Sequence, residues 1–79
     1  MSNSEKLYNA FAQALHIDPQ RISDALAYNS IPEWDSVAHM ALVAEIETVF
    51  AIMMDTDDIV DMSTVGKARQ IVAKHGIAF

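Results

Sequence analysis

The sequence predicts an all-α fold: a small four-helix bundle of three main helices and one short helix, with a long first loop. A chain of 79 residues suits a single domain over positions 1–79 and has room for a small core. Apolar residues make up 52% of the chain, and it holds only two Gly and two Pro, which argues against a turn-rich β-sandwich or barrel. The chain has no Cys, which excludes disulfide scaffolds, zinc fingers and catalysis by a protein thiol.

The charge balance is acidic, with 5 basic and 11 acidic residues and a net charge of −6. Such a balance disfavours binding to nucleic acids or anionic membranes and favours a basic protein partner. The N-terminus carries no signal segment, and no window approaches about 18 uninterrupted apolar residues. We therefore expect a cytoplasmic protein that is a monomer by default.

The first helix is predicted over residues 4–15. Ser2 and Glu5 have the spacing of a capping box, and the step Asp18-Pro19 prevents the helix from continuing far beyond His16. Apolar residues recur at helical spacing on one face of this segment; they are Leu7, Phe11, Ala14 and Leu15.

A long connection covers residues 17–35 and contains both prolines. Four of its apolar residues follow no clean period, so we expect them to pack on the core, with a short helical turn near Ser23. These residues are Ile22, Leu26, Tyr28 and Ile31.

The second helix is predicted to begin at Asp35-Ser36, where either residue is a suitable N-cap, and to end near Phe50. Two apolar stripes run along different sides of this helix. A chain of 79 residues cannot bury such a helix on every side, so we expect one side to be a binding face. One stripe holds Leu42, Val43, Ile46, Val49 and Phe50, and the other holds Val37, Met40, Ala41 and Ala44.

Two further helices complete the predicted bundle. A short helix over residues 56–60 is opened by carboxylates at its positive end. The last helix begins at Ser63 or Thr64 and ends near His75, just before Gly76. Its predicted buried face holds Val65, Ala68, Ile71 and Val72.

Eight acidic residues flank or lie within the second and third predicted helices, beside the surplus apolar stripe. The plain interpretation is a solvated surface. The alternative is an acidic rim around an apolar docking face, which would steer basic partners toward it. The eight residues are Glu33, Asp35, Glu45, Glu47, Asp55, Asp57, Asp58 and Asp61.

Ser36 lies where the second helix opens. The free N–H groups and the positive end of a helix favour a phosphate at such a position. The alternative is a plain N-cap, a role that Ser and Asp commonly fill.

The string around Ser36 resembles the attachment motif of acyl carrier proteins and related phosphopantetheine-binding carriers. That family has Asp-Ser-Leu followed by spaced apolar residues, a Glu and a Phe, and the resemblance covers roughly residues 5–75. The chain departs from the pattern at Glu33 and Trp34, where the family has Gly and a small residue. It also lacks the early acids of general fatty-acid carriers, which indicates a specialised pathway. The matching residues here are Asp35, Ser36, Val37, Leu42, Ile46, Glu47 and Phe50.

The resemblance implies a free-standing carrier that is not itself an enzyme. A phosphopantetheinyl transferase would attach 4′-phosphopantetheine to Ser36, with Asp35 helping to position the transferase. The thiol of that group would hold an acyl or aminoacyl thioester for partner enzymes with basic docking patches. We expect no residue to serve as a metal ligand. The expected docking residues are Glu33, Trp34, Val37, Met40, Ala44, Glu47, Asp57 and Asp58.

Three other interpretations compete with the carrier. A hydrolase would need His39 as the base for Ser36, yet the pair has no orienting third group. A calcium loop starting at Asp55 would need Gly and Glu where Val60 and Gly66 stand. An unmodified acidic adaptor that binds a partner through the second helix explains the charge and the apolar stripe, and would tolerate Ser36→Ala.

Overall fold

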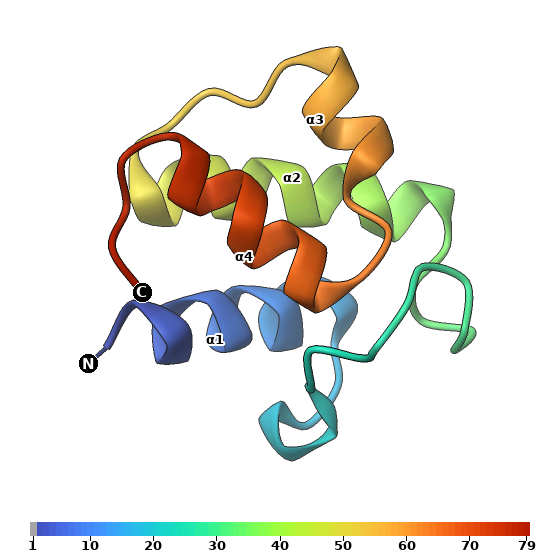
Figure 1. The fold of residues 1–79 in the computed structure, drawn as a ribbon. Coiled ribbons are helices and arrows are strands. Elements are labelled where there is room, and N and C mark those ends of the chain that lie inside the picture. Colours follow the sequence, from blue (N-terminus) through green and yellow to red (C-terminus); the bar gives the residue numbers. More distant parts are fainter. Residues whose placement is uncertain (1) are drawn as a thin grey trace.

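The computed structural model describes residues 2–79, and within that range it contains four α-helices and one 3₁₀ turn. The helices are α1 (Asn3–Leu15), α2 (Ser36–Phe50), α3 (Thr56–Asp61) and α4 (Val65–Lys74), and the turn η1 is Pro19–Arg21. Figure 1 shows α1, α2 and α4 as the main bundle, with α3 at its upper edge and the long first loop at one side. This arrangement confirms the predicted all-α bundle and its helix order.

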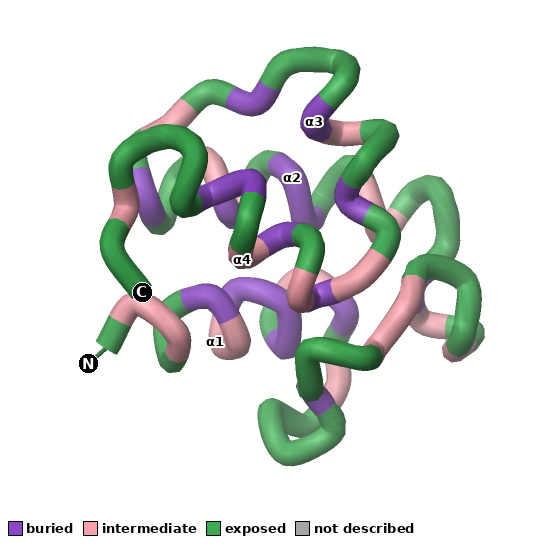
Figure 2. Tube along the Cα trace, in the orientation of Figure 1, coloured by how far each residue is buried: buried purple, intermediate pink, exposed green. Residues whose placement is uncertain are grey.

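The core lies between α1, α2 and α4. Buried stretches recur along these three helices, whereas the connection after α1 is mostly exposed (Figure 2). Because α1 packs against α2, the stripe predicted for the first helix meets the first of the two stripes predicted for the second helix inside the bundle. Val49, predicted in that stripe, is instead 36% exposed. The largest fully buried side chains are Trp34, Phe11, Leu7, Leu15, Leu42, Ile46, Met62, Val65 and Val72.

Both ends of α1 follow from local sequence. The Ser2 hydroxyl accepts a hydrogen bond from the Glu5 amide at 3.1 Å, and the Glu5 carboxylate accepts one from the Ser2 amide. This capping box satisfies two of the amides that a helix leaves free at its start. The helix ends at His16, which adopts the left-handed region with a φ of 57°.

The turn in the long connection lies earlier than predicted. The 3₁₀ turn covers Pro19–Arg21. It forms there because the Asp18 carboxylate accepts from the Gln20 amide at 2.9 Å and because Pro19 suits the first position of a helical turn. Ser23 lies outside this 3₁₀ turn but opens a separate turn, in which its carbonyl accepts from the Leu26 amide at 3.1 Å. Of the four apolar residues expected on the core, Ile22 is buried, Leu26 and Ile31 are partly buried, and Tyr28 remains 39% exposed.

The middle of the connection is tied to the start of α4. The amides of Tyr28, Val65 and Gly66 donate to the carbonyls of Ser63, Leu26 and Asp24, respectively, at 2.9–3.0 Å. A Cβ at Gly66 would lie 3.3 Å from the Asp24 oxygen, so the glycine permits this close approach.

The predicted exposure of Trp34 is wrong. Its side chain is fully buried, and its ring packs edge-on against Phe11 with centroids 5.3 Å apart. A buried indole needs an acceptor for its N–H, and His39 supplies one at 3.0 Å. Trp34 is therefore a core residue that anchors the loop in front of α2, and it is unable to contact a partner.

None of the helices in the described part of the chain is both long and apolar enough to cross a membrane.

Candidate functional site

Ser36 is the first residue of α2, and Asp35 is its N-cap. One Asp35 carboxylate oxygen accepts from the Ala38 amide at 2.8 Å, and the Asp35 carbonyl accepts from the His39 amide at 2.8 Å. By sequence either residue is a suitable N-cap, and in the structure Asp35 fills that role. Ser36 is exposed, and among residues 2–79 its hydroxyl makes no hydrogen bond.

Two backbone donors of this helix start also remain free within the described chain. The amides of Ser36 and Val37 have no partner there, whereas those of Ala38 and His39 are bonded to Asp35. Free amides and the aligned peptide dipoles make this end of α2 electropositive. A phosphate ester on the Ser36 hydroxyl would lie next to these donors.

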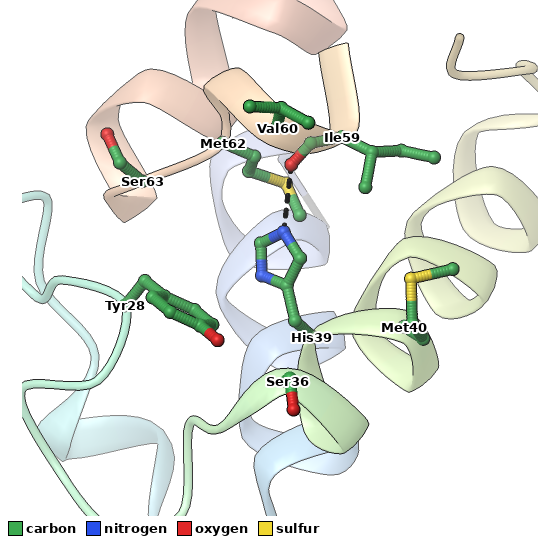
Figure 3. Close-up of a pocket in the computed structure, with 8 residues that line it drawn as sticks. All are labelled: Tyr28, Ser36, His39, Met40, Ile59, Val60, Met62 and Ser63. Carbon is green, nitrogen blue, oxygen red and sulfur yellow. Dashed lines mark hydrogen bonds between the residues drawn. The ribbon is translucent and has the colours of Figure 1, made fainter. Parts of the chain in front are cut away.

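A groove of about 360 Å³ begins at Ser36 and runs between α2 and α3. Figure 3 shows Ser36 at one end of it, with its hydroxyl pointing away from the other lining side chains. The lining is mostly apolar, as is typical of ligand and partner sites that carry few polar groups. The first loop and α2 contribute Tyr28, Ser36, His39 and Met40, and the other wall consists of Ile59, Val60, Met62 and Ser63.

His39 holds the floor of this groove in place. Its Nδ1 accepts the indole N–H of Trp34 at 3.0 Å, and its Nε2 lies 2.9 Å from the Ile59 carbonyl oxygen (Figure 3). Because the indole only donates and the carbonyl only accepts, the ring must carry its proton on Nε2. His39 thus joins the first loop, α2 and α3.

The same two hydrogen bonds bear on the hydrolase interpretation. A general base for the Ser36 hydroxyl needs a free ring nitrogen within hydrogen-bond reach. Both nitrogens of His39 are occupied, one by Trp34 and the other by Ile59. This arrangement leaves His39 with no lone pair for Ser36.

Three of the expected docking residues lie together on the outside of α2. Val37 is 78% exposed and Met40 is 56% exposed, and Ala44 is also exposed. Their spacing places them on the side of the helix opposite its buried stripe. The structure thus brings Val37, Met40 and Ala44 onto one face that starts at Ser36.

Of the acidic residues expected at the edges of this face, some are exposed to solvent and others are bonded to neighbouring residues. Asp57 is exposed in the first turn of α3. Glu33 pairs with Arg21 at 3.3 Å, and its pKa lies below the ordinary value because its own backbone amide and then Arg21 stabilise the carboxylate. Glu47 is partly buried and accepts from the Met54 amide at 2.8 Å, so its carboxylate holds the turn after α2.

Asp58 is not at the edge of a docking face, contrary to the prediction. Its side chain is buried, and its two carboxylate oxygens contact Lys74 and His75 at the end of α4. The hydrogen bond from Lys74 holds the pKa of Asp58 below its usual value, and Asp58 in turn raises the pKa of Lys74. Asp58 therefore fastens α3 to α4, because a buried charge requires a partner.

The acidic run from Asp55 to Asp58 also has a structural use. The Asp55 carboxylate is the N-cap of α3 and accepts from the Asp58 amide at 2.8 Å. Within the described chain, no three His, Cys, Asp or Glu side chains gather closely enough to hold a metal ion.

Sequence reasoning missed the groove itself and the pair that supports it. Trp34 and His39 are five positions apart across a loop–helix boundary, so no helical or strand period links them. The available signal was chemical, since a buried Trp needs an acceptor for its N–H, and His39 is one of three acceptor side chains, with Asp35 and Ser36, that follow within five residues. No protein-family model, curated protein or solved structure matches the chain.

Proposed function

We propose that the protein is a carrier, in which Ser36 accepts 4′-phosphopantetheine from a phosphopantetheinyl transferase that uses coenzyme A and Mg²⁺. The observation that supports the proposal most is the Ser36 hydroxyl, which is exposed and unbonded within the described chain. It stands at the start of a 15-residue helix that its neighbour Asp35 already caps. The fold therefore caps α2 without the Ser36 hydroxyl, which is left available for modification.

The surroundings of Ser36 fit a phosphodiester at this point. The Ser36 oxygen would bond to the phosphorus of the pantetheine phosphate as the pyrophosphate bond of coenzyme A breaks. Adenosine 3′,5′-bisphosphate would leave, and the hydroxyl proton would pass to the transferase. The free amides of Ser36 and Val37 and the positive end of α2 favour the added negative charge. When attached, the group supplies a terminal thiol, absent from this Cys-free chain, that carries acyl or aminoacyl groups as thioesters.

The groove beside Ser36 supports the same function. An organic group attached to Ser36 could pack against the apolar walls of the groove. Since His39 is bonded to both Trp34 and Ile59, the fold fixes the position of α2 relative to α3, the two sides of the groove. The chain binds and presents the cargo, and the chemistry belongs to the partner enzymes.

The test is transfer of a fluorescent phosphopantetheine from labelled coenzyme A by a promiscuous transferase. We expect labelling of the wild-type chain and none of Ser36→Ala. The matched control is Ser63→Ala, which removes another exposed hydroxyl from the lining of the same groove. Labelling of Ser63→Ala should equal that of the wild type.

A folded wild-type chain that several transferases leave unlabelled would contradict the proposal. Circular dichroism on the same samples shows that each variant is folded. Absence of label would then favour the unmodified adaptor, whose partner would be sought through the outside of α2.

A further inference from the structure

We propose that His39 is an acid-sensitive switch, in which protonation of the imidazole ring releases the first loop from α2 beside Ser36. The contact that protonation breaks is the hydrogen bond from the Trp34 indole to Nδ1 of His39, at 3.0 Å. The switch is a property of the fold alone, whereas its effect on the modification of Ser36 rests on the proposed function.

The bond between Trp34 and His39 exists only while the imidazole ring is neutral. Nδ1 needs its lone pair to accept from Trp34, and Nε2 carries the single ring proton toward the Ile59 carbonyl oxygen, 2.9 Å away (Figure 3). In a protonated ring both nitrogens are donors. The indole N–H and the new Nδ1–H would then face each other, whereas the bond to Ile59 would remain. Protonation therefore breaks the connection to the first loop and keeps the connection to α3.

None of the elements around the ring supplies it with a counter-charge within residues 2–79. On the first loop, Tyr28 presents its ring edge-on at 5.2 Å. On α2, the Asp35 carboxylate caps the helix, and on α3 the Asp58 carboxylate is turned toward α4. The remaining acidic residues of this region lie outside the lining of the groove; they are Asp55, Asp57 and Asp61. Because a partly buried imidazolium without a bonded carboxylate is costly, protonation favours movement of the ring over a new ion pair.

Protons have a direct route to this ring. His39 is only partly buried and lines the groove that begins at the exposed Ser36. Histidine is the side chain that ordinarily changes its charge between about pH 5 and pH 8. Mild acid is therefore the signal to which the switch responds.

Trp34 transmits the change to the site. A buried indole N–H that loses its acceptor is costly, so release of His39 favours movement of the Trp34 side chain. The Trp34 backbone is bonded to the same loop, since its carbonyl accepts from the Asn29 amide at 2.9 Å and its amide donates to the Ile31 carbonyl at 3.2 Å. The next residue, Asp35, is the N-cap that fixes the start of α2 at Ser36. A displaced loop therefore shifts the cap and the hydroxyl that follows it.

The first experiment measures acrylamide quenching of Trp34 fluorescence at about pH 7.5 and about pH 5.5. Trp34 is the only tryptophan of the chain, so the signal reports on the first loop. We expect quenching of the wild type to rise at least about twofold in acid, because the indole without its acceptor leaves its buried position. His39→Gln should abolish this rise, since glutamine offers an acceptor and a donor and does not titrate.

The matched control is His16→Asn. His16 is exposed at the end of α1, and asparagine tolerates its left-handed backbone, which has a φ of 57°. This variant removes a titrating histidine elsewhere and should keep the rise in quenching of the wild type. Circular dichroism at both pH values checks that each chain is folded.

Nuclear magnetic resonance of the wild type gives a second measurement that needs no variant. The indole N–H signal of Trp34 should shift with the same midpoint pH as the ring protons of His39. Unchanged quenching in acid, or a rise that persists in His39→Gln, would overturn the switch. A Trp34 signal whose midpoint follows His16 or His75 would also overturn it, by assigning the change to another histidine.

The effect on Ser36 is measured as the rate of phosphopantetheine transfer to the wild type divided by the rate for His39→Gln. This ratio cancels the pH dependence of the transferase itself. We expect it to fall at least about threefold between about pH 7.5 and about pH 5.5, because a displaced hydroxyl is poorly aligned for attack. A constant ratio beside a clear rise in quenching would overturn the coupling to Ser36. A wild type that is labelled at neither pH would contradict the proposed function, and the quenching result would still decide the switch.

Discussion

The two faces of α2 are both apolar, yet only one of them is used by the fold. The inner face, consisting of Leu42, Val43, Ile46 and Phe50, is buried in the core. The outer face carries Val37 and Met40, which are 78% and 56% exposed. Because burial of apolar surface drives folding, the inner face explains why the helix forms and packs. The outer face has no such explanation, which directs attention to function.

The position of Ser36 strengthens this contrast. It stands at the start of the outer face, and the groove between α2 and α3 begins beside it. Polar groups that the fold needs in this region are all engaged: Asp35 caps α2, and His39 bonds to Trp34 and Ile59. The Ser36 hydroxyl at the start of α2 and the apolar surface beside it remain unengaged, and the proposed carrier would use both.

The largest expected effect is on the inner face. Ile46→Ala removes a fully buried side chain from α2 and should lower the free energy of unfolding by about 2–5 kcal/mol. Urea unfolding followed by circular dichroism measures the loss. A loss below about 0.5 kcal/mol would mean that the inner face does not form the core.

The next effect concerns the link between the first loop and α2. Trp34→Phe leaves Nδ1 of His39 without its donor and should destabilise the protein by roughly 1–3 kcal/mol. A double-mutant cycle with His39→Phe isolates the pair, and we expect a coupling energy of about 0.5 kcal/mol or more. Additive single and double variants would show that the two side chains do not interact.

The attachment of α3 to α4 should respond to pH. The folded state lowers the pKa of Asp58, so this contribution to stability is present above the unfolded carboxyl pKa and is lost as the pH falls through the lowered value. For Lys74 the pKa is raised, so its contribution is lost as the pH rises through that raised value. Urea unfolding across acidic pH measures the first loss.

The matched variants for this pH dependence are Asp58→Asn and Asp57→Asn. Replacing the buried Asp58 should flatten the acidic decline in stability, whereas replacing its exposed neighbour should preserve most of it. An identical pH profile for both variants would show that the ion pair with Lys74 does not stabilise the fold.

The smallest expected effect completes the comparison of the two faces. Val37→Ala removes methyl groups from the same helix as Ile46→Ala, but from an exposed position. The free energy of unfolding should change by less than about 0.5 kcal/mol. A loss as large as that of Ile46→Ala would mean that the outer face belongs to the core and is not a binding surface.

The helices were predictable because their signals are local. The capping box at Ser2 and Glu5 and the stripe of α2 need only nearby residues to be recognised. Trp34 and Asp58 were placed wrongly at the surface because their partners are set by the tertiary fold. Met54 is buried and its neighbour Met53 is exposed, a difference that depends on how the turn after α2 is held by Glu47.

The candidate site likewise has features that local sequence predicts and features that depend on the tertiary fold. Ser36 at a helix start follows from the local string, and the exposure of Val37 and Met40 follows from the surplus apolar stripe. The groove requires the relative position of α2 and α3, which His39 fixes through the Ile59 carbonyl. That contact spans 20 positions, too far for any local pattern to indicate.

The most direct test of the account is the mass of the protein as its own cells make it. We expect the intact chain to carry a single phosphopantetheine, and fragmentation to locate it on Ser36. A chain of unmodified mass, or one modified at another residue, would contradict the claim that Ser36 and the outer face of α2 exist to carry and deliver a cargo.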